Sequence, residues 1–191
     1  MDLSSLNFPF GENICWYPSH SHQQLPQNGL SDWLLSRESL TQKLKQCCQQ
    51  FEVIVLGEQW ITPNPAEWHG PEQKLWLREV LLQLDGTPWV FARTLMSPQL
   101  LAEQQQLEQL GQRPLGELLF SGERFTAGEI EICHITPPSA MSELASALKQ
   151  TASTPVWGRR RHFSCQQLPL IVAEVFLPAA EQAITASATA V

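Results

Sequence analysis

Two arginines lie in the most apolar stretch of this chain. Arg78 and Arg93 belong to two hydrophobic runs, residues 75–84 and 87–96, which only Asp85-Gly86 separates. An Asp-Gly pair between apolar runs is typical of a β-hairpin, because the turn requires positive φ at its central residues. A guanidinium binds carboxylates and phosphates through paired hydrogen bonds. The two residues therefore indicate a pocket for a small organic anion.

The simplest register places both arginines on one face of the hairpin. If Leu84 pairs with Thr87 across a two-residue loop, continuing the register sets Arg78 opposite Arg93. Like charges facing each other across strands are destabilising, and a buried guanidinium without a partner is costly. We therefore expect a bound anion there. The alternatives are a structural carboxylate from elsewhere in the fold, or arginine heads that reach water at a sheet edge.

A single carboxyl group interrupts a third apolar run. Glu174 alternates with Leu170, Val172 and Phe176 in residues 168–178. Such a group either pairs with a cation, as in a purely structural ion pair, or its pKa rises and it stays protonated. A protonated carboxyl can act as a proton donor at neutral pH. Glu174 is therefore a candidate catalytic residue, and a role as donor, acceptor or orienting group remains open.

Composition restricts the class of protein. The chain has 191 residues, 43% of them hydrophobic, and a formal net charge of −7, which fits one domain with a sizeable core. The longest basic run is Arg159-Arg160-Arg161, so we expect no nucleic-acid partner. Five cysteines without metal-ligand spacing indicate reduced thiols, no metal site and a cytoplasmic location. We expect no membrane span, because no apolar run reaches about eighteen residues, and we expect a monomer.

The elements that must position these residues follow from hydrophobic spacing and turn residues. Residues 1–29 are predicted to form an irregular arm, and residues 179–191 a flexible tail. Between them we expect a single α+β domain, residues 30–178, with a mainly antiparallel sheet and helices packed against it. Residues 136–154 are predicted to be an insertion that carries a short surface helix. Helices are expected within 31–50, from Ser97-Pro98 to Gly111 and after Pro114, and strands at 51–57, 75–84, 87–96, 129–135, 156–164 and 168–178.

At this point the sequence resembles the chorismate lyases, also called chorismate pyruvate-lyases, of ubiquinone biosynthesis. The resemblance extends from residue 30 to residue 178 in the order of the family. The segments that carry it are Asp32-Trp-Leu-Leu35, Trp76-Leu-Arg-Glu79, Asp85-Gly86 with Pro88-Trp89, Arg93-Thr94, Leu110-Gly111, Pro114-Leu-Gly116, Leu119-Phe120, Ile130-Glu-Ile132, Trp157-Gly-Arg-Arg160 and Glu174-Val-Phe-Leu-Pro178.

The resemblance implies a cofactor-free lyase that converts chorismate to 4-hydroxybenzoate and pyruvate, the first step of ubiquinone biosynthesis. The ligand would lie in a closed internal cavity under flaps. By resemblance, Arg78 binds the ring carboxylate, Glu174 meets the 4-hydroxyl end, and Leu115 contacts the ligand. Leu40 falls where the family often has a methionine over the ligand.

Two questions remain open in the sequence. Chorismate has two carboxylates, so Arg93 either binds the second one or supports Arg78, in which case Arg159 or Arg160 supplies the second cation. The alternative function is a sensor that binds a small acid without turnover, because the effector domains of some transcription regulators resemble chorismate lyases in fold. Those domains normally follow a DNA-binding winged helix of about sixty to seventy residues, whereas only about thirty irregular residues precede Trp33.

Overall fold

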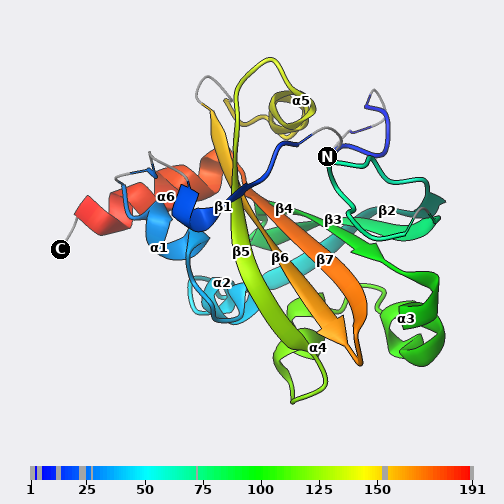
Figure 1. The fold of residues 1–191 in the computed structure, drawn as a ribbon. Coiled ribbons are helices and arrows are strands. Elements are labelled where there is room, and N and C mark those ends of the chain that lie inside the picture. The colour runs from blue at the N-terminus through cyan, green and yellow to red at the C-terminus, as the bar shows by residue number, and fades with distance from the viewer. Residues whose placement is uncertain are drawn as a thin grey trace.

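A seven-stranded antiparallel sheet forms the centre of the computed structural model, which describes residues 3, 6–11, 14–21, 25–26, 28–71, 73–151 and 155–189. The strand order is β1-β5-β6-β7-β4-β3-β2 (Figure 1). The strands are β1 (Tyr17–Pro18), β2 (Phe51–Ile61), β3 (Leu75–Leu84), β4 (Thr87–Met96), β5 (Thr126–Ile135), β6 (Val156–Cys165) and β7 (Leu168–Phe176). The predicted α+β class and antiparallel sheet are confirmed.

In the described part of the chain, six α-helices pack against the sheet. They are α1 (Leu30–Leu34), α2 (Leu40–Lys45), α3 (Pro98–Glu103), α4 (Leu115–Phe120), α5 (Ala140–Ala147) and α6 (Pro178–Thr189), and 3-10 turns cover Ser19–Ser21 and Gln105–Leu107. Ser39 and Ser97 cap α2 and α3 by accepting hydrogen bonds from the third backbone N–H of each helix. Among the described residues, no helix is long and apolar enough to cross a membrane.

The hairpin forms as predicted at its turn but not along its length. Leu84 pairs with Thr87, and Asp85 and Gly86 have φ of 46° and 80°. A bulge then shifts the register, because Gln83 pairs with Pro88 whereas Leu82 pairs with Val90. A proline has no N–H to give to the ladder and is found at bulges. The prediction that Arg78 and Arg93 share a face is therefore wrong: Arg78 pairs with Thr94, and Arg93 pairs with Glu79.

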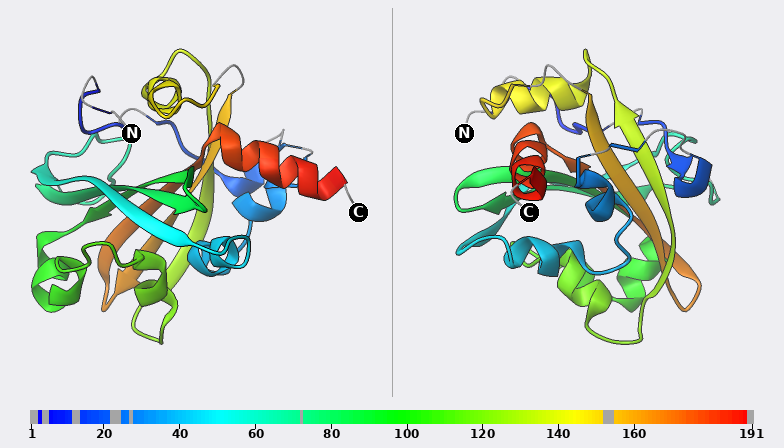
Figure 2. Two further views of the ribbon diagram at one scale, coloured as in Figure 1. Left: turned by 180° about the vertical axis from the view of Figure 1, so that it is seen from behind. Right: turned by 90° about the vertical axis from the view of Figure 1, so that its left-hand side faces the viewer.

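One side of the sheet, here called the cavity face, carries Arg78, Val80, Thr94 and Glu174. Helices α1, α2 and α6 cover part of it with Leu30, Leu34, Leu40, Leu44, Ala180 and Ile184. Helices α3 and α4 cover the rest with Leu100, Leu101 and Leu119, which pack with Met96 and Leu170. Helices α2 and α4 lie side by side across this face (Figure 2).

The opposite side, here called the arm face, carries Glu79, Phe91 and Arg93. The N-terminal arm covers it with Phe10 and Ile14, and α5 covers it with Met141 and Leu144. Helix α5 lies at the end of the sheet opposite α3 and α4 (Figure 1). The predicted short helix within 136–154 is confirmed. Its apolar stripe is buried in the core, however, and is not a surface feature.

The prediction of a flexible tail after residue 178 is wrong for the described part. Residues 178–189 form α6, which packs against β4 and α1. Ala180 and Ile184 are 0% and 6% exposed and belong to the same core cluster as Leu30 and Leu34. The reason is the four-residue spacing of these two apolar side chains, which gives the helix one face to bury.

Candidate active site

A cavity lies between the cavity face and helices α2 and α4. The centre of a water-sized sphere can move through about 30 Å³ of it, and the space between its atoms, which includes space open to solvent, is about 390 Å³. The side of the sheet is apolar except for Arg78, Thr94 and Glu174, and the opposite wall comes from residues around the start of each helix. The lining residues are Thr41, Val53, Arg78, Val80, Leu82, Ala92, Thr94, Arg113, Pro114, Leu115, Gly116, Val172 and Glu174.

Arg78 projects from β3 into the cavity lining and is 3% exposed. Its guanidinium forms an ion pair with Glu58, its neighbour on β2, and donates from Nη2 to the Gly111 carbonyl at 2.6 Å. These contacts join the sheet to the loop before α4. They use two of the five N–H groups of a guanidinium, so Arg78 retains donors for a ligand carboxylate.

Glu174 projects from β7 into the same cavity, and its side chain is 16% exposed. Its Oε2 accepts a hydrogen bond from Nε of Arg159, its cross-strand neighbour on β6, at 2.7 Å. Of the two states expected for a carboxyl in an apolar run, pairing with a cation is therefore the one found. A carboxylate held in this way can accept a proton or a hydrogen bond.

The two predicted apolar contacts have different positions. Leu115 begins α4 and lines the cavity. Leu40 is 3% exposed and packs in the same cluster as the cavity residues Val80 and Leu82, but its neighbour Thr41 lines the cavity instead. Leu40 therefore supports the wall from behind.

Helices α2 and α4 approach each other closely at this wall. A Cβ added to Gly116 would lie 2.4 Å from Oγ1 of Thr41. No real Cβ contact is that short, so a glycine at position 116 is what permits the two helices to close over the cavity.

Arg93 is not in this cavity, because the bulge places it on the arm face. Its Nε and Nη2 donate to Glu67 at 2.7 and 3.0 Å, and its Nη1 donates to Glu79 at 2.5 Å. Glu79 also accepts from the backbone N–H groups of Phe10 and Gly11. Burial alone would lower the pKa of Arg93, but the bonds from Glu67 and Glu79 raise that pKa overall. Arg93 thus realises the structural carboxylate alternative with two carboxylates, whereas Arg78 pairs with one, Glu58, and also lines the cavity.

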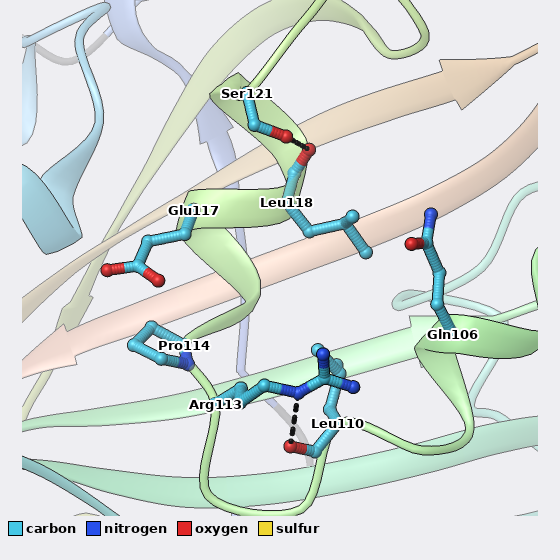
Figure 3. Close-up of a pocket in the computed structure, with 7 residues that line it drawn as sticks. All are labelled: Gln106, Leu110, Arg113, Pro114, Glu117, Leu118 and Ser121. Carbon is cyan, nitrogen blue, oxygen red and sulfur yellow. Dashed lines mark hydrogen bonds between the residues drawn. The ribbon is translucent and has the colours of Figure 1, made fainter.

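Sequence reasoning missed Arg113 and Glu58. Arg113 follows the Gly111 turn, and its Nη2 donates to the Gln109 carbonyl at 2.9 Å. It lines the cavity and also a surface pocket formed by Gln106, Leu110, Pro114, Glu117, Leu118 and Ser121 (Figure 3). An arginine in a polar loop gives no hydrophobic anomaly to detect. Glu58 was missed because the strand was expected to end at Gly57.

The charges near the cavity favour an anion although the chain is acidic overall. Arg78, Arg113 and Arg159 lie in or against the cavity, and the carboxylates paired with them are Glu58 and Glu174. In the described part of the chain, no group of three or more His, Cys, Asp or Glu residues could hold a metal ion.

The fold, a seven-stranded antiparallel sheet with helices on both faces, places the chain in a class of α+β domains that includes solved structures. The effector domain of PhnF from Mycobacterium smegmatis covers 76% of this chain and 91% of its own length, with a TM-score of 0.56 and 16% identity. The C-terminal domain of the histidine utilization repressor from Pseudomonas syringae pv. tomato covers 69% of this chain and 94% of its own length, with a TM-score of 0.53 and 15% identity. At such identities the likeness concerns the fold alone.

Sequence similarity identifies the family. A family model described as chorismate lyase matches residues 10–184. A protein from Shewanella sp. (strain W3-18-1) is 50% identical over 186 residues, or 96% of this chain and 99% of the relative. A protein from Pseudoalteromonas atlantica is 35% identical over 181 residues, or 91% of each chain. Both are named "Probable chorismate pyruvate-lyase". The chain belongs to the chorismate lyase family, which confirms the resemblance found in the sequence.

Proposed function

We propose that this protein is a chorismate pyruvate-lyase that converts chorismate to 4-hydroxybenzoate and pyruvate without a cofactor. The observation that carries the proposal is the placement of Arg78 and Glu174 in one cavity that is otherwise largely apolar. Family membership and the names of the relatives support the same reaction. By resemblance, this reaction would be the first step of ubiquinone biosynthesis.

The substrate would lie between the two charged residues. Arg78 would bind the ring carboxylate through a charge-assisted bond, and Glu174 would accept a hydrogen bond from the 4-hydroxyl group. Leu115 would contact the ring, with Leu40 supporting the wall behind Thr41. Because Arg93 lies on the other face, we assign the enolpyruvyl carboxylate to Arg113, which lines the same cavity.

The reaction is an elimination that aromatises the ring. The C4–H bond breaks, its electron pair forms the C3–C4 double bond, and the C3–O bond breaks to release enolpyruvate. The proton from C4 is returned to enolpyruvate, which becomes pyruvate, so no oxidant or reductant is needed. The pairing of Glu174 with Arg159 favours an accepting or orienting role over that of a proton donor. Positioning and exclusion of water would supply much of the acceleration.

The decisive experiment is a turnover assay with purified protein and chorismate in the presence of a chelator, with no nucleotide added. Equal amounts of 4-hydroxybenzoate, followed by ultraviolet absorbance, and pyruvate, followed with a coupled dehydrogenase, are expected. Glu174→Gln should reduce the rate at least tenfold while the variant stays folded. Full turnover by that variant would contradict the role of Glu174, and no turnover by the wild type would contradict the proposed reaction.

A thermal-shift measurement separates the remaining readings. Product that binds the folded state raises the melting temperature by mass action. A sensor would show this shift with 4-hydroxybenzoate but no turnover, and a purely structural protein would show neither. We further propose that the protein acts as a monomer in the cytoplasm, which sedimentation of the purified chain and cell fractionation would test.

A further inference from the structure

Arg159 connects the proposed catalytic carboxylate to the segment that leads into α2, the helix that provides Thr41 to the cavity wall. Its Nε donates to Glu174, and its Nη1 donates to the carbonyls of Trp33 and Ser36 at 3.0 and 2.8 Å. Arg159 is 7% exposed. One rigid guanidinium thus bonds simultaneously to a cavity residue and to the backbone at the end of α1.

Besides Arg159, the segment is held by Arg161, which donates to the Arg37 carbonyl, and by the exposed pair of Arg37 with Glu129. Residues 35–38 connect α1 to α2, and of these only Ser36 is not exposed. The last carbonyls of a helix need donors from outside the helix, and Arg159 supplies one at Trp33. Helix α2, which begins directly after this connection, places Thr41 in the cavity wall. A change in the connection would therefore move part of that wall.

A neighbouring arginine makes half of the same arrangement. Arg161 also projects from the cavity face of β6, and its Nη1 donates to the Arg37 carbonyl at 2.7 Å, while its Nε donates to Gly128. Neither of these two hydrogen bonds of Arg161 goes to Glu174. Arg161 thus holds the same connection through bonds to backbone carbonyls.

We propose that Arg159 is a positioning residue that couples the orientation of Glu174 to the closed position of the α1–α2 connection. When the connection is closed, the carbonyls of Trp33 and Ser36 fix the guanidinium of Arg159, so that its Nε donates to Glu174. When the connection opens, the guanidinium loses these two carbonyls, and the carboxylate of Glu174 is then no longer held in one orientation. The catalytic carboxylate would then be aligned only while the connection holds α2 and Thr41 in place at the cavity wall. The kinetic part of this inference rests on the proposed function.

The first test replaces the guanidinium of Arg159 with an ammonium group, which keeps the positive charge. A lysine is a single charged point and cannot bond to Glu174 and both carbonyls with the geometry of a guanidinium. Arg159→Lys should lower kcat for chorismate at least tenfold and change KM less than threefold. Arg161→Lys, the matched control, should keep kcat within twofold of the wild type. The proposal is overturned if Arg159→Lys also stays within twofold, or if both variants lose activity equally.

The second test needs neither turnover nor a change at Arg159. Glu174→Gln removes the charge that holds Nε of Arg159, the residue through which Glu174 is connected to the Ser36 carbonyl. Amide hydrogen exchange in residues 35–38 should become at least fivefold faster, and exchange in residues 105–112 should stay unchanged. Unchanged exchange in residues 35–38 would overturn the coupling. If the wild type fails to turn over chorismate while exchange responds as expected, the proposed reaction fails and the coupling stands.

Discussion

Arg78 and Arg93 lie on the same hairpin and are equally buried, at 3% exposed each, yet the two faces of the sheet use them differently. Arg93 meets two carboxylates whose side chains are 8% and 0% exposed. Arg78 meets one carboxylate that is 27% exposed and one carbonyl, and it lines a cavity. The comparison teaches that burial of an arginine does not mark a binding site. What distinguishes Arg78 is that some of its N–H donors remain available beside a cavity.

Each face also has a glycine where its cover makes a close approach. On the cavity face, Gly116 allows α4 to approach Thr41 of α2. On the arm face, a Cβ added to Gly11 would lie 2.8 Å from Phe91 and 2.9 Å from the Arg93 side chain. The N-terminal arm therefore lies directly on the ion pairs of Arg93, and the two covers can be disturbed separately.

The largest effect is expected from Arg93→Ala. It would leave Glu67 and Glu79 as buried carboxylates without their cation, which costs about 3–5 kcal/mol of unfolding free energy. Denaturant unfolding measures this loss. A triple variant, Arg93→Met with Glu67→Gln and Glu79→Gln, should recover more than half of it, because no buried charge remains. A loss below about 1 kcal/mol for Arg93→Ala would show that the two arginines do not differ in this way.

Arg78→Met, in contrast to Arg93→Ala, should reduce activity more than it reduces stability. Bonds to a charged group contribute about 1.5–3 kcal/mol, so kcat/KM for chorismate should fall about tenfold to a hundredfold. The unfolding free energy should fall less than for Arg93→Ala, because Glu58 is partly exposed and can be hydrated. Steady-state kinetics and denaturant unfolding on the same preparation test both parts. A variant that is destabilised but fully active would reverse the comparison.

The two glycines give a matched pair with smaller effects. Gly116→Ala should separate α4 from α2 and weaken binding of 4-hydroxybenzoate about tenfold, because overpacking typically costs about 1–3 kcal/mol. Gly11→Ala should lower the unfolding free energy by a similar amount while product affinity stays within twofold. Calorimetric titration and thermal unfolding measure the two quantities. Equal effects of both variants on affinity would mean that the faces are not independent.

The sequence was sufficient for those features that depend on local spacing. The Asp85-Gly86 turn and the placement of Arg78, Leu115 and Glu174 around one cavity follow from alternation along strands and from the family pattern. The lone charge in each apolar run was the useful signal, since such a charge must have a partner.

The features that sequence reasoning missed depend on one extra residue or on distant packing. A bulge at Pro88 adds one residue to β4, and a shift of one residue moves every later side chain to the other face. Arg93 was therefore assigned to the wrong side. The small residues after Pro178 suggested a tail, but Ile184 finds a partner surface that only the folded α1 provides.

The smallest effect concerns acid stability and tests whether the arm face acts alone. Glu131 lies on that face and accepts hydrogen bonds from Arg160 at 2.6 Å and His162 at 2.9 Å. Burial alone would raise the pKa of Glu131, but these bonds lower it overall. The pKa in the folded state is then below the unfolded value of about 4.3. The stabilisation is complete above the unfolded pKa and is lost as the pH falls through the folded one.

Glu131→Gln should therefore flatten the fall in unfolding free energy below pH of about 5, measured by denaturant unfolding across the acid range. Glu129→Gln is the matched control, because Glu129 is on the same strand but its pair with Arg37 is exposed and contributes little. An equally steep fall in Glu131→Gln would assign the acid response to other groups. If Glu131→Gln also changed the affinity for 4-hydroxybenzoate, the arm face would be communicating with the cavity through β6, which carries both Arg160 and Arg159.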